Sequence, residues 1–216
     1  MDSRKNPDST VIARYVADSI GSDLQNQLWE SCPPVQITHQ WSGEPAPRSR
    51  SAEVRLCWNE EALTVRFIGE QHEPLVISDR PVLDRKTLGL WDRDVCEIFV
   101  APDPDHPERY FEFEAAPTGE WVDLGIVLIP SGRETDWDFA SGMTVATKIG
   151  SEKIFVAMTI PWSTRIPKPE AGAEWRTNLF RCIGSDEATR YLAWRPTHTP
   201  EPNFHVSEAF GVLRFS

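Results

Sequence analysis

Apolar and polar residues alternate along most of this chain, and hardly any stretch has helical spacing. Residues 53–58 alternate up to a turn at 59–61, and Leu63, Val65 and Phe67 then share one face. A period of two is typical of strands with one buried face, so these two runs predict a hairpin. Eight more strand-like runs follow, separated by clusters of Pro and Gly: 94–100, 109–115, 120–129, 142–149, 153–160, 174–183, 190–195 and 210–215.

This pattern predicts an all-β protein, an antiparallel β-sandwich of about ten strands. One short helix is expected at 22–30, where Ser22 and Asp23 provide a cap and the following prolines end it. A chain of 216 residues can bury a core without disulfide or metal support. We therefore expect a flexible N-terminus at 1–10 and a single domain at 11–216.

The charge balance excludes two classes of partner. The chain has 33 acidic and 22 basic residues, a formal net charge of −11, and no run of Lys and Arg exceeds two residues. Nucleic acids and anionic membranes require a local excess of cations, so neither is an expected partner. No apolar stretch is long enough for a transmembrane helix or resembles a secretory signal. The expected location is the cytoplasm, or outside the cell if a leader precedes the given sequence.

Common catalytic and metal-binding motifs are absent. The sequence has no G-x-G-x-x-G, P-loop, G-x-S-x-G or H-E-x-x-H pattern. The four cysteines form no C-x-x-C, and Cys57, Cys96 and Cys182 lie within apolar runs, where we expect buried thiols. His198 and His205 share one C-terminal loop, which is weak evidence for a metal, and hydrogen bonding within the loop is the favoured interpretation.

The run around Glu97 is the most informative stretch. Cys96, Ile98 and Val100 are expected to face the core, so Glu97 lies on the opposite face, flanked by apolar Val95. A carboxylate on a partly apolar face can accept hydrogen bonds from hydroxyl groups. Pairing with a neighbouring arginine is the alternative, and the sequence leaves both open.

A second acidic pair follows in the next run. Phe111, Phe113 and Ala115 are expected to point inward, so Glu112 and Glu114 share the other face about 7 Å apart. That separation overlaps the range of inverting glycosidases, but any Glu-x-Glu on a strand produces it. A structural or binding role is therefore favoured over catalysis.

Most of the tryptophans are expected to have structural roles. Trp194 ends a strand at the edge of a loop, where one face of its ring can meet a ligand. Core or strand-end packing is expected for Trp58, Trp121, Trp162 and Trp175.

Several of these segments, in this order, resemble carbohydrate-binding module family 9. They are the W-x-x-D-x-x-E-I-F pattern of residues 91–99, the run 110–113, Asn178, the segment 194–196 and the F-G-x-L of residues 210–213. The similarity covers nearly the whole chain. It implies a non-catalytic β-sandwich that holds sugars, typically the ends of plant polysaccharides and their oligomers.

The resemblance also implies a site. Trp91 and Trp194 would clamp one sugar ring, Glu97 would hydrogen-bond its hydroxyls, and the other expected ligand-binding residues are Glu112, Asn178 and Arg195. Glu112 stands where sugar-binding members have an arginine, which leaves the ligand preference open. Calcium is implied by the resemblance alone. No other cofactor is expected, because Met143 and Met158, considered as haem ligands, are assigned to the core.

Three hypotheses follow. The favoured one is non-catalytic binding of a mono- or oligosaccharide. The second is an interaction module that has kept the sandwich and lost the sugar site. The third, least favoured, is a glycoside hydrolase that uses Glu97, Glu112 and Glu114.

Overall fold

The computed structural model describes residues 9–216, and in that part of the chain 14 strands form one continuous sheet without an α-helix. From edge to edge the main path is β10 (Thr144–Ile149), β11 (Lys153–Pro161), β5 (Ala62–Glu70), β4 (Ala52–Trp58), β1 (Thr10–Tyr15), β14 (Gly211–Phe215), β12 (Glu174–Cys182), β6 (Val95–Ala101), β7 (Arg109–Ala115), β8 (Trp121–Ile129) and β9 (Gly132–Asp136). Off this path, β2 (Val35–Ile37) pairs with β4, and β13 (Tyr191–Ala193) pairs with β12 and β3 (His39–Gln40). Within residues 9–216 no helix is long and apolar enough to span a bilayer.

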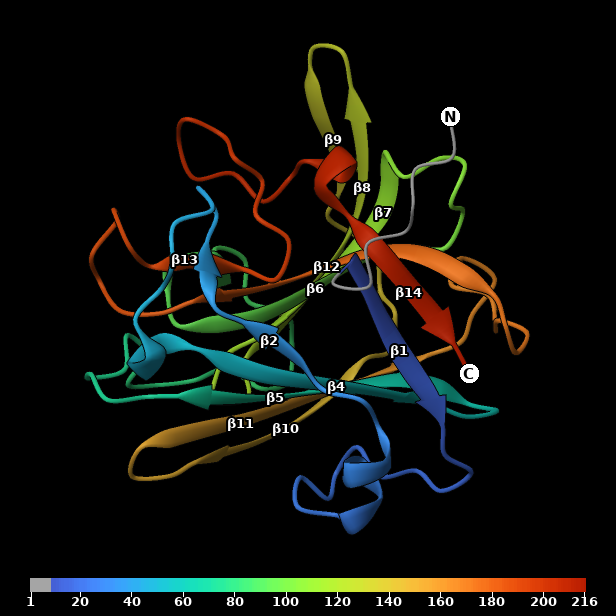
Figure 1. Cartoon of the computed structure of the whole chain (residues 1–216), viewed down its shortest axis with the longest axis horizontal. Helices are drawn as coiled ribbons and strands as arrows, with labels where there is room; N and C mark the ends of the chain where they lie inside the picture. Colours follow the sequence, from blue (N-terminus) through green and yellow to red (C-terminus); the bar gives the residue numbers. More distant parts are fainter. Residues whose placement is uncertain (1–8) are drawn as a thin grey trace.

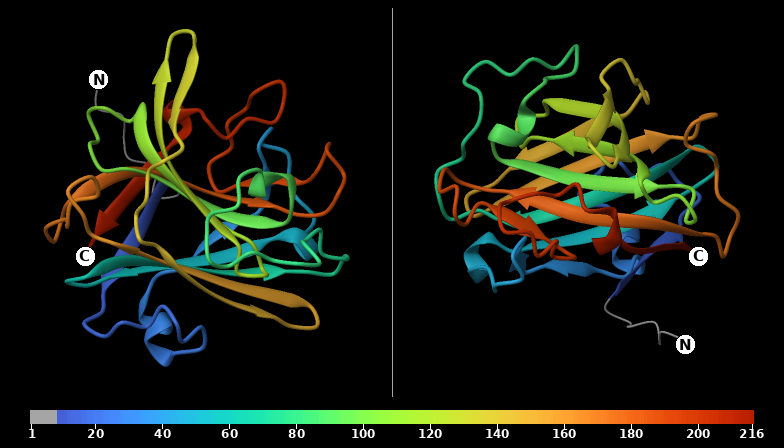
Figure 2. Two further views of the ribbon diagram at one scale, coloured as in Figure 1. Left: turned by 180° about the vertical axis from the view of Figure 1, so that it is seen from behind. Right: turned by 90° about the horizontal axis from the view of Figure 1, so that it is seen from above.

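The sheet folds over into two layers around the main core, and the predicted all-β sandwich is confirmed (Figure 1). β4, β5, β10 and β11 form one layer, and β6 and β12 belong to the other. β1 joins them, because it pairs in parallel with both β4 and β14. The view from behind shows the same two layers (Figure 2). Buried side chains from both layers meet between them, among them Leu56, Val65, Phe67, Val156, Ile98, Val100, Phe113 and Leu179.

The ten predicted strands all occur, but the predicted number is wrong because β1, β2, β3 and β9 are also present. β2 and β3 have three and two residues, too few to show a period. β9 has the sequence Gly-Arg-Glu-Thr-Asp and carries no apolar alternation. Thr10, predicted to lie in a flexible terminus, begins β1, whereas residues 1–8 of that prediction lie outside the described part.

The predicted helix at 22–30 is wrong. The structure has a 3-10 turn there instead, η2 (Gln27–Ser31). Asp23 accepts hydrogen bonds from the Gln25 backbone and the Asn26 side chain, and Asn26 accepts one from the Leu28 backbone. Such short polar side chains stabilise local turns in competition with a helix. The segment is also too short to offset the cost of helix nucleation before the prolines.

Alternation along β6 and β7 divides their side chains as predicted. Cys96, Ile98, Val100 and Phe113 lie in the main core. The opposite, outer face carries a second apolar cluster, which includes Val95, Phe99, Tyr110, Leu124 and Phe180. Phe204 and Phe210, from the C-terminal segment, complete this second cluster.

The other expectations for the core are confirmed. All four cysteines are buried with free thiols, and Met143 and Met158 belong to the main core. Trp58 and Trp175 are buried in that core, while Trp121 and Trp162 pack against it.

A buried arginine ties the two layers together. Arg181 on β12 is 1% exposed, and its guanidinium lies against Gly69 on β5. It donates hydrogen bonds to the backbone oxygens of Arg50 and Ser51 and to Oε1 of Gln71. Since buried acceptors without a donor are costly, these bonds fix one end of the sandwich.

Replacing Arg181 by Met should reduce the free energy of unfolding by about 3 kcal/mol or more, because the Arg50 backbone oxygen and Oε1 of Gln71 lose a donor and the layers lose this link. Urea denaturation of both proteins measures this difference. Arg14→Met, at an exposed position on β1, is the matched control and should change stability by less than about 0.5 kcal/mol. Equal stability of the two variants would show that the buried guanidinium is dispensable.

Candidate functional site

Three glutamates meet on the outer face of β6 and β7, and we call Glu97, Glu112 and Glu114 the glutamate cluster. Glu97 pairs directly across from Glu114, and Glu112 pairs with Phe99. Their exposed fractions are only 2%, 4% and 0%. One carboxylate oxygen from each lies within 4.8 Å of the others. Like charges facing one another on a sheet repel, so the cluster costs stability unless protons or a ligand neutralise it.

The glutamate cluster has few hydrogen-bond partners in the described part of the chain. The Cys182 thiol donates to Oε1 of Glu97 at 3.4 Å, a weak bond. Oε2 of Glu112 and both carboxylate oxygens of Glu114 are buried and accept no hydrogen bond from any other described group, although the two carboxyls lie close enough to share a proton. Nε2 of His205 lies 4.0 Å from Oε2 of Glu112, which is beyond hydrogen-bond distance. The cluster therefore retains unused acceptors.

Burial raises the pKa of all three carboxyls, and repulsion by neighbouring carboxylates adds to the rise for Glu97 and Glu114. Burial is the main cause for Glu97, and the charge of Glu112 adds to it. Burial also raises the pKa of Glu112. For Glu114, burial acts first and the charges of Glu97 and Glu112 add to the rise. The cluster thus keeps protons at a higher pH than separate surface glutamates would.

A pocket of about 190 Å³ opens above this cluster, and we call it the glutamate pocket. Trp91 comes from the 3-10 turn η4 (Leu90–Asp92), which directly precedes β6, and Tyr191 is the first residue of β13. The other lining residues are Phe99, Arg133, Cys182, Pro202, Asn203, Phe204 and His205. An acidic floor is thus combined with aromatic walls.

Stacking and hydrogen bonds hold these walls in place. Phe204 stacks on Phe180 with ring centroids 4.0 Å apart and meets Tyr191 edge to face. Nδ1 of His205 is hydrogen-bonded to the Tyr110 hydroxyl at 2.6 Å. Burial lowers the pKa of His205 to about 3, so its imidazole is neutral at neutral pH. The walls are therefore formed before any ligand arrives.

Arg190 holds Trp91 in position. Its guanidinium donates to the backbone oxygens of Trp91 and Arg93, at 3.4 and 3.0 Å. Because Arg190 directly precedes Tyr191, one segment of chain supports two of the aromatic walls.

The other predicted site residues lie elsewhere. Trp194 and Arg195 line a separate hollow of about 630 Å³, which also contains His198. The Trp194 ring lies against Gly211, where a side chain would collide with it. Asn178 is fully buried, and its amide group bonds to the backbone of Arg195 and Leu179. The structure therefore brings Trp91, Glu97 and Glu112 together but not Trp194, Asn178 or Arg195.

Sequence reasoning missed most of the residues that form the walls of the pocket. Tyr191, Phe204 and His205 were not predicted as site residues, although all three line it. The available signal was the adjacent Phe204 and His205 in an otherwise polar loop just before the terminal F-G-x-L. Glu114, considered only as a catalytic candidate, completes the floor.

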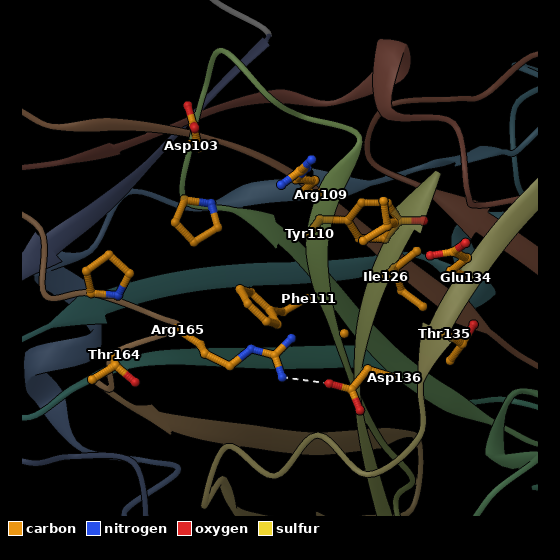
Figure 3. Close-up of a pocket in the computed structure, with 14 residues that line it drawn as sticks. Asp103, Arg109, Tyr110, Phe111, Ile126, Glu134, Thr135, Asp136, Thr164 and Arg165 are labelled. Carbon is orange, nitrogen blue, oxygen red and sulfur yellow. Dashed lines mark hydrogen bonds and ion pairs between the residues drawn. The ribbon is translucent and has the colours of Figure 1, made fainter. Parts of the chain in front are cut away.

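A larger hollow of about 680 Å³ lies over β7, β8 and β9 (Figure 3). Arg165 crosses it to reach Oδ2 of Asp136 at 2.6 Å, and its guanidinium lies 4.7 Å from the Phe139 ring centroid. Hydrogen bonding from Arg165 lowers the pKa of Asp136. Arg165 and Asp136 therefore already bond to each other, in contrast to the glutamate cluster, whose acceptors lack donors. None of the predicted site residues lines this hollow.

The family resemblance implies calcium. In the described part of the chain, one group of side chains has the spacing to hold a metal ion, the glutamate cluster. Calcium takes six to eight oxygen ligands, and three carboxylates can supply up to about six. The residue types therefore fit a hard divalent cation.

The pH dependence of stability should reveal the raised pKa of Glu114. The folded protein keeps this proton above the unfolded pKa of about 4.3, so the stability it contributes is complete below that pH and is lost as the pH rises through the folded pKa. Glu114→Gln cannot ionise and should be more stable than the parent at neutral pH by on the order of 1 kcal/mol. The difference should shrink towards pH 4.3.

Urea denaturation across this pH range measures the difference, and comparison at each pH removes the contributions of groups that both proteins share. Glu134→Gln, at an exposed position on β9, should show no such trend. A parent that is more stable than Glu114→Gln at neutral pH would contradict the assignment.

Known proteins share this fold. A Bacteroides uniformis ATCC 8492 structure titled a "putative carbohydrate-binding protein" superposes with a TM-score of 0.73 at 17% identity, covering 96% of this chain and 99% of that one. A carbohydrate binding module family 9 from Caldicellulosiruptor kristjanssonii, in complex with glucose, gives 0.67 at 16% identity and covers 96% and 95%. Its complex with cellotriose gives 0.67 at 15% identity and covers 96% and 93%.

No protein of curated function matches the sequence. A family model does, that of the carbohydrate family 9 binding domain-like proteins, and the match extends over residues 20–216. Because it covers most of the chain, from before η2 to the end of β14, it agrees with the resemblance noted in the sequence. The chain belongs to the carbohydrate family 9 binding domain-like family.

Proposed function

We propose that this chain binds carbohydrate without cleaving it and that one sugar ring occupies the glutamate pocket. The observation that carries the proposal is the combination in one pocket of aromatic walls and unused carboxylate acceptors. Its volume of about 190 Å³ is below the range of about 300–1,000 Å³ for drug-sized ligands and suits a single ring. Structures of the same fold with glucose and cellotriose support this class of ligand.

Each part of the pocket has a role in this proposal. The C–H face of a pyranose is apolar and loses contact with water when it lies on the indole of Trp91. The carboxylate of Glu97 accepts hydrogen bonds from the hydroxyls at the edge of the ring, and such charge-assisted bonds are stronger than neutral ones. Burying about 100 Å² of apolar area against one ring contributes roughly 2–3 kcal/mol. After the cost of association, a Kd between about 1 μM and 1 mM is expected.

The two-tryptophan clamp remains a prediction from the sequence. Trp91 lines the glutamate pocket, and Trp194 lines the separate hollow. In our proposal Tyr191 and Phe204 supply further aromatic wall, and both already form part of the pocket.

The geometry favours binding over glycoside hydrolysis. In a glycosidase, two carboxyls flank the scissile bond, about 5–5.5 Å apart in retaining enzymes and about 6.5–9.5 Å apart in inverting ones. In the glutamate cluster, one oxygen from each of three carboxyls lies within 4.8 Å of the others on one sheet face, so the carboxyls converge on a single point instead of flanking a bond. The open pocket also favours sugar binding over an interaction module that has lost its sugar site.

Trp91→Ala should weaken binding of glucose and cello-oligosaccharides by about tenfold or more, because the ring loses its apolar platform. Isothermal titration calorimetry measures the affinity, and circular dichroism checks the fold. Trp137→Ala removes a 45% exposed tryptophan outside the pocket and should leave the affinity within about twofold. No heat from the parent with any sugar at about tens of millimolar would refute the proposal.

Trp194→Phe tests the clamp separately. Since Trp194 lies outside the glutamate pocket, we expect an affinity within about twofold of the parent. A loss as large as that of Trp91→Ala would instead support the clamp predicted from the sequence.

A further inference from the structure

We propose that the sugar held in the glutamate pocket carries a free primary ammonium group, as glucosamine does, and that this group sits on Glu97, Glu112 and Glu114. The inference rests on the proposed function and specifies its ligand class. Three observations carry it: the unused acceptors, the shortage of donors in the pocket, and the aromatic walls.

Once they are ionised, the three carboxylates that form the floor of the pocket can accept hydrogen bonds but cannot donate them. Both oxygens of Glu114 and Oε2 of Glu112 are buried with no hydrogen bond from any described residue outside the cluster. An unpaired buried carboxylate is expensive, so a ligand that brings both donors and positive charge would gain most here. A hydroxyl group brings one donor and no charge, whereas an ammonium group brings three donors and a full charge.

The spacing of the carboxylates fits an ammonium group. Three N–H···O bonds of about 2.8 Å, directed tetrahedrally, place their acceptor oxygens about 4.6 Å apart. In the glutamate cluster, one carboxylate oxygen from each of the three residues lies within 4.8 Å of the other two. One ammonium group could therefore engage one carboxylate from each glutamate.

The protein supplies little positive charge of its own at this place. Arg133 is the one lysine or arginine among the residues that line the described pocket, and its side chain is exposed. Burial keeps His205 neutral, and its Nδ1 is already bonded to Tyr110. The charge of Arg190 also acts on Glu97, but its guanidinium donates to the side chain of Glu187 and to the backbone oxygens of Trp91 and Arg93. Among the described residues, the donor bonded to the cluster is the weak thiol of Cys182. A cationic ligand would fill this deficit.

The walls favour an organic cation over a bare metal ion. Trp91, Phe99, Tyr191 and Phe204 all line the pocket. Aromatic faces attract ammonium groups and the C–H faces of a sugar, whereas a hydrated divalent ion gains nothing from them. The volume of about 190 Å³ also exceeds what one ion needs. An amino sugar uses both the floor and the walls.

Isothermal titration calorimetry at about pH 6.5, where a primary amine is protonated, tests the inference with D-glucosamine, D-glucose and N-acetylglucosamine. We expect glucosamine to bind about tenfold or more tightly than the other two, because only its nitrogen is charged. The preference should weaken as salt is raised. Glu114→Gln should bring the ratio of the glucosamine and glucose affinities to within about threefold, whereas Glu134→Gln, on the exposed hairpin, should leave it unchanged.

Further ligands distinguish failure of this inference from failure of the proposed sugar-binding function. Equal or tighter binding of glucose would overturn the inference and leave the proposed function intact. Binding of cyclohexylammonium, a six-membered ring with the charge and no hydroxyls, in the absence of any sugar binding would support the ammonium site and refute the sugar function. Stabilisation by Ca²⁺ or Mn²⁺ alone, lost in Glu114→Gln and accompanied by no glucosamine preference, would identify a metal site and overturn the inference.

Discussion

The stacking of Phe204 on Phe180, with centroids 4.0 Å apart, anchors the segment after β13 to the outer face of the sheet. That segment converts an open sheet face into a covered one. It brings His205 over the glutamate cluster and completes the second apolar cluster of the fold. Without this cover the three glutamates would face solvent and carry ordinary charges. Their burial, and hence the chemistry of the pocket, depends on how this loop packs.

Most of the fold could be predicted from the sequence, because the alternation of apolar and polar residues along a strand is a local signal. Ten runs with a period of two became ten strands, and the same parity correctly placed Glu97 and Glu112 on the face away from the main core. The short strands β2 and β3 escaped prediction because they are defined by partners far along the chain. Turn-forming side chains around Asp23 likewise prevailed over an apparent helix.

The site was harder to predict, because it depends on which loop covers which face. Glu97 and Trp91 share one motif and one short segment, so local spacing sufficed for them. Trp194 and Phe204 both follow β13, and no periodic pattern tells which of them turns towards the glutamates. The structure directs Phe204 to the pocket and places Trp194 against Gly211. The sequence prediction of an aromatic ligand-binding residue after β13 therefore named Trp194, whereas the aromatic residue of this segment that lines the pocket is Phe204.

The glutamate cluster lowers the stability of the fold, and the packing of the fold does not explain why it is present. Three carboxylates are gathered within 4.8 Å in a buried place, although apolar residues there would pack against the surrounding aromatic side chains without any charge penalty. Buried polar groups without partners commonly mark sites whose stability is reserved for a ligand. By contrast, Arg181 in the main core has its guanidinium bonded to three acceptors and serves the fold itself.

The central claim is that a sugar ring binds in the glutamate pocket, and a crystal structure grown with D-glucosamine or D-glucose tests it most directly. The account predicts a pyranose ring beside Trp91, with one of its polar groups within hydrogen-bond distance of a carboxylate oxygen of Glu97. A ring found in the hollow beside Trp194, with the glutamate pocket empty in the same crystal, would contradict it.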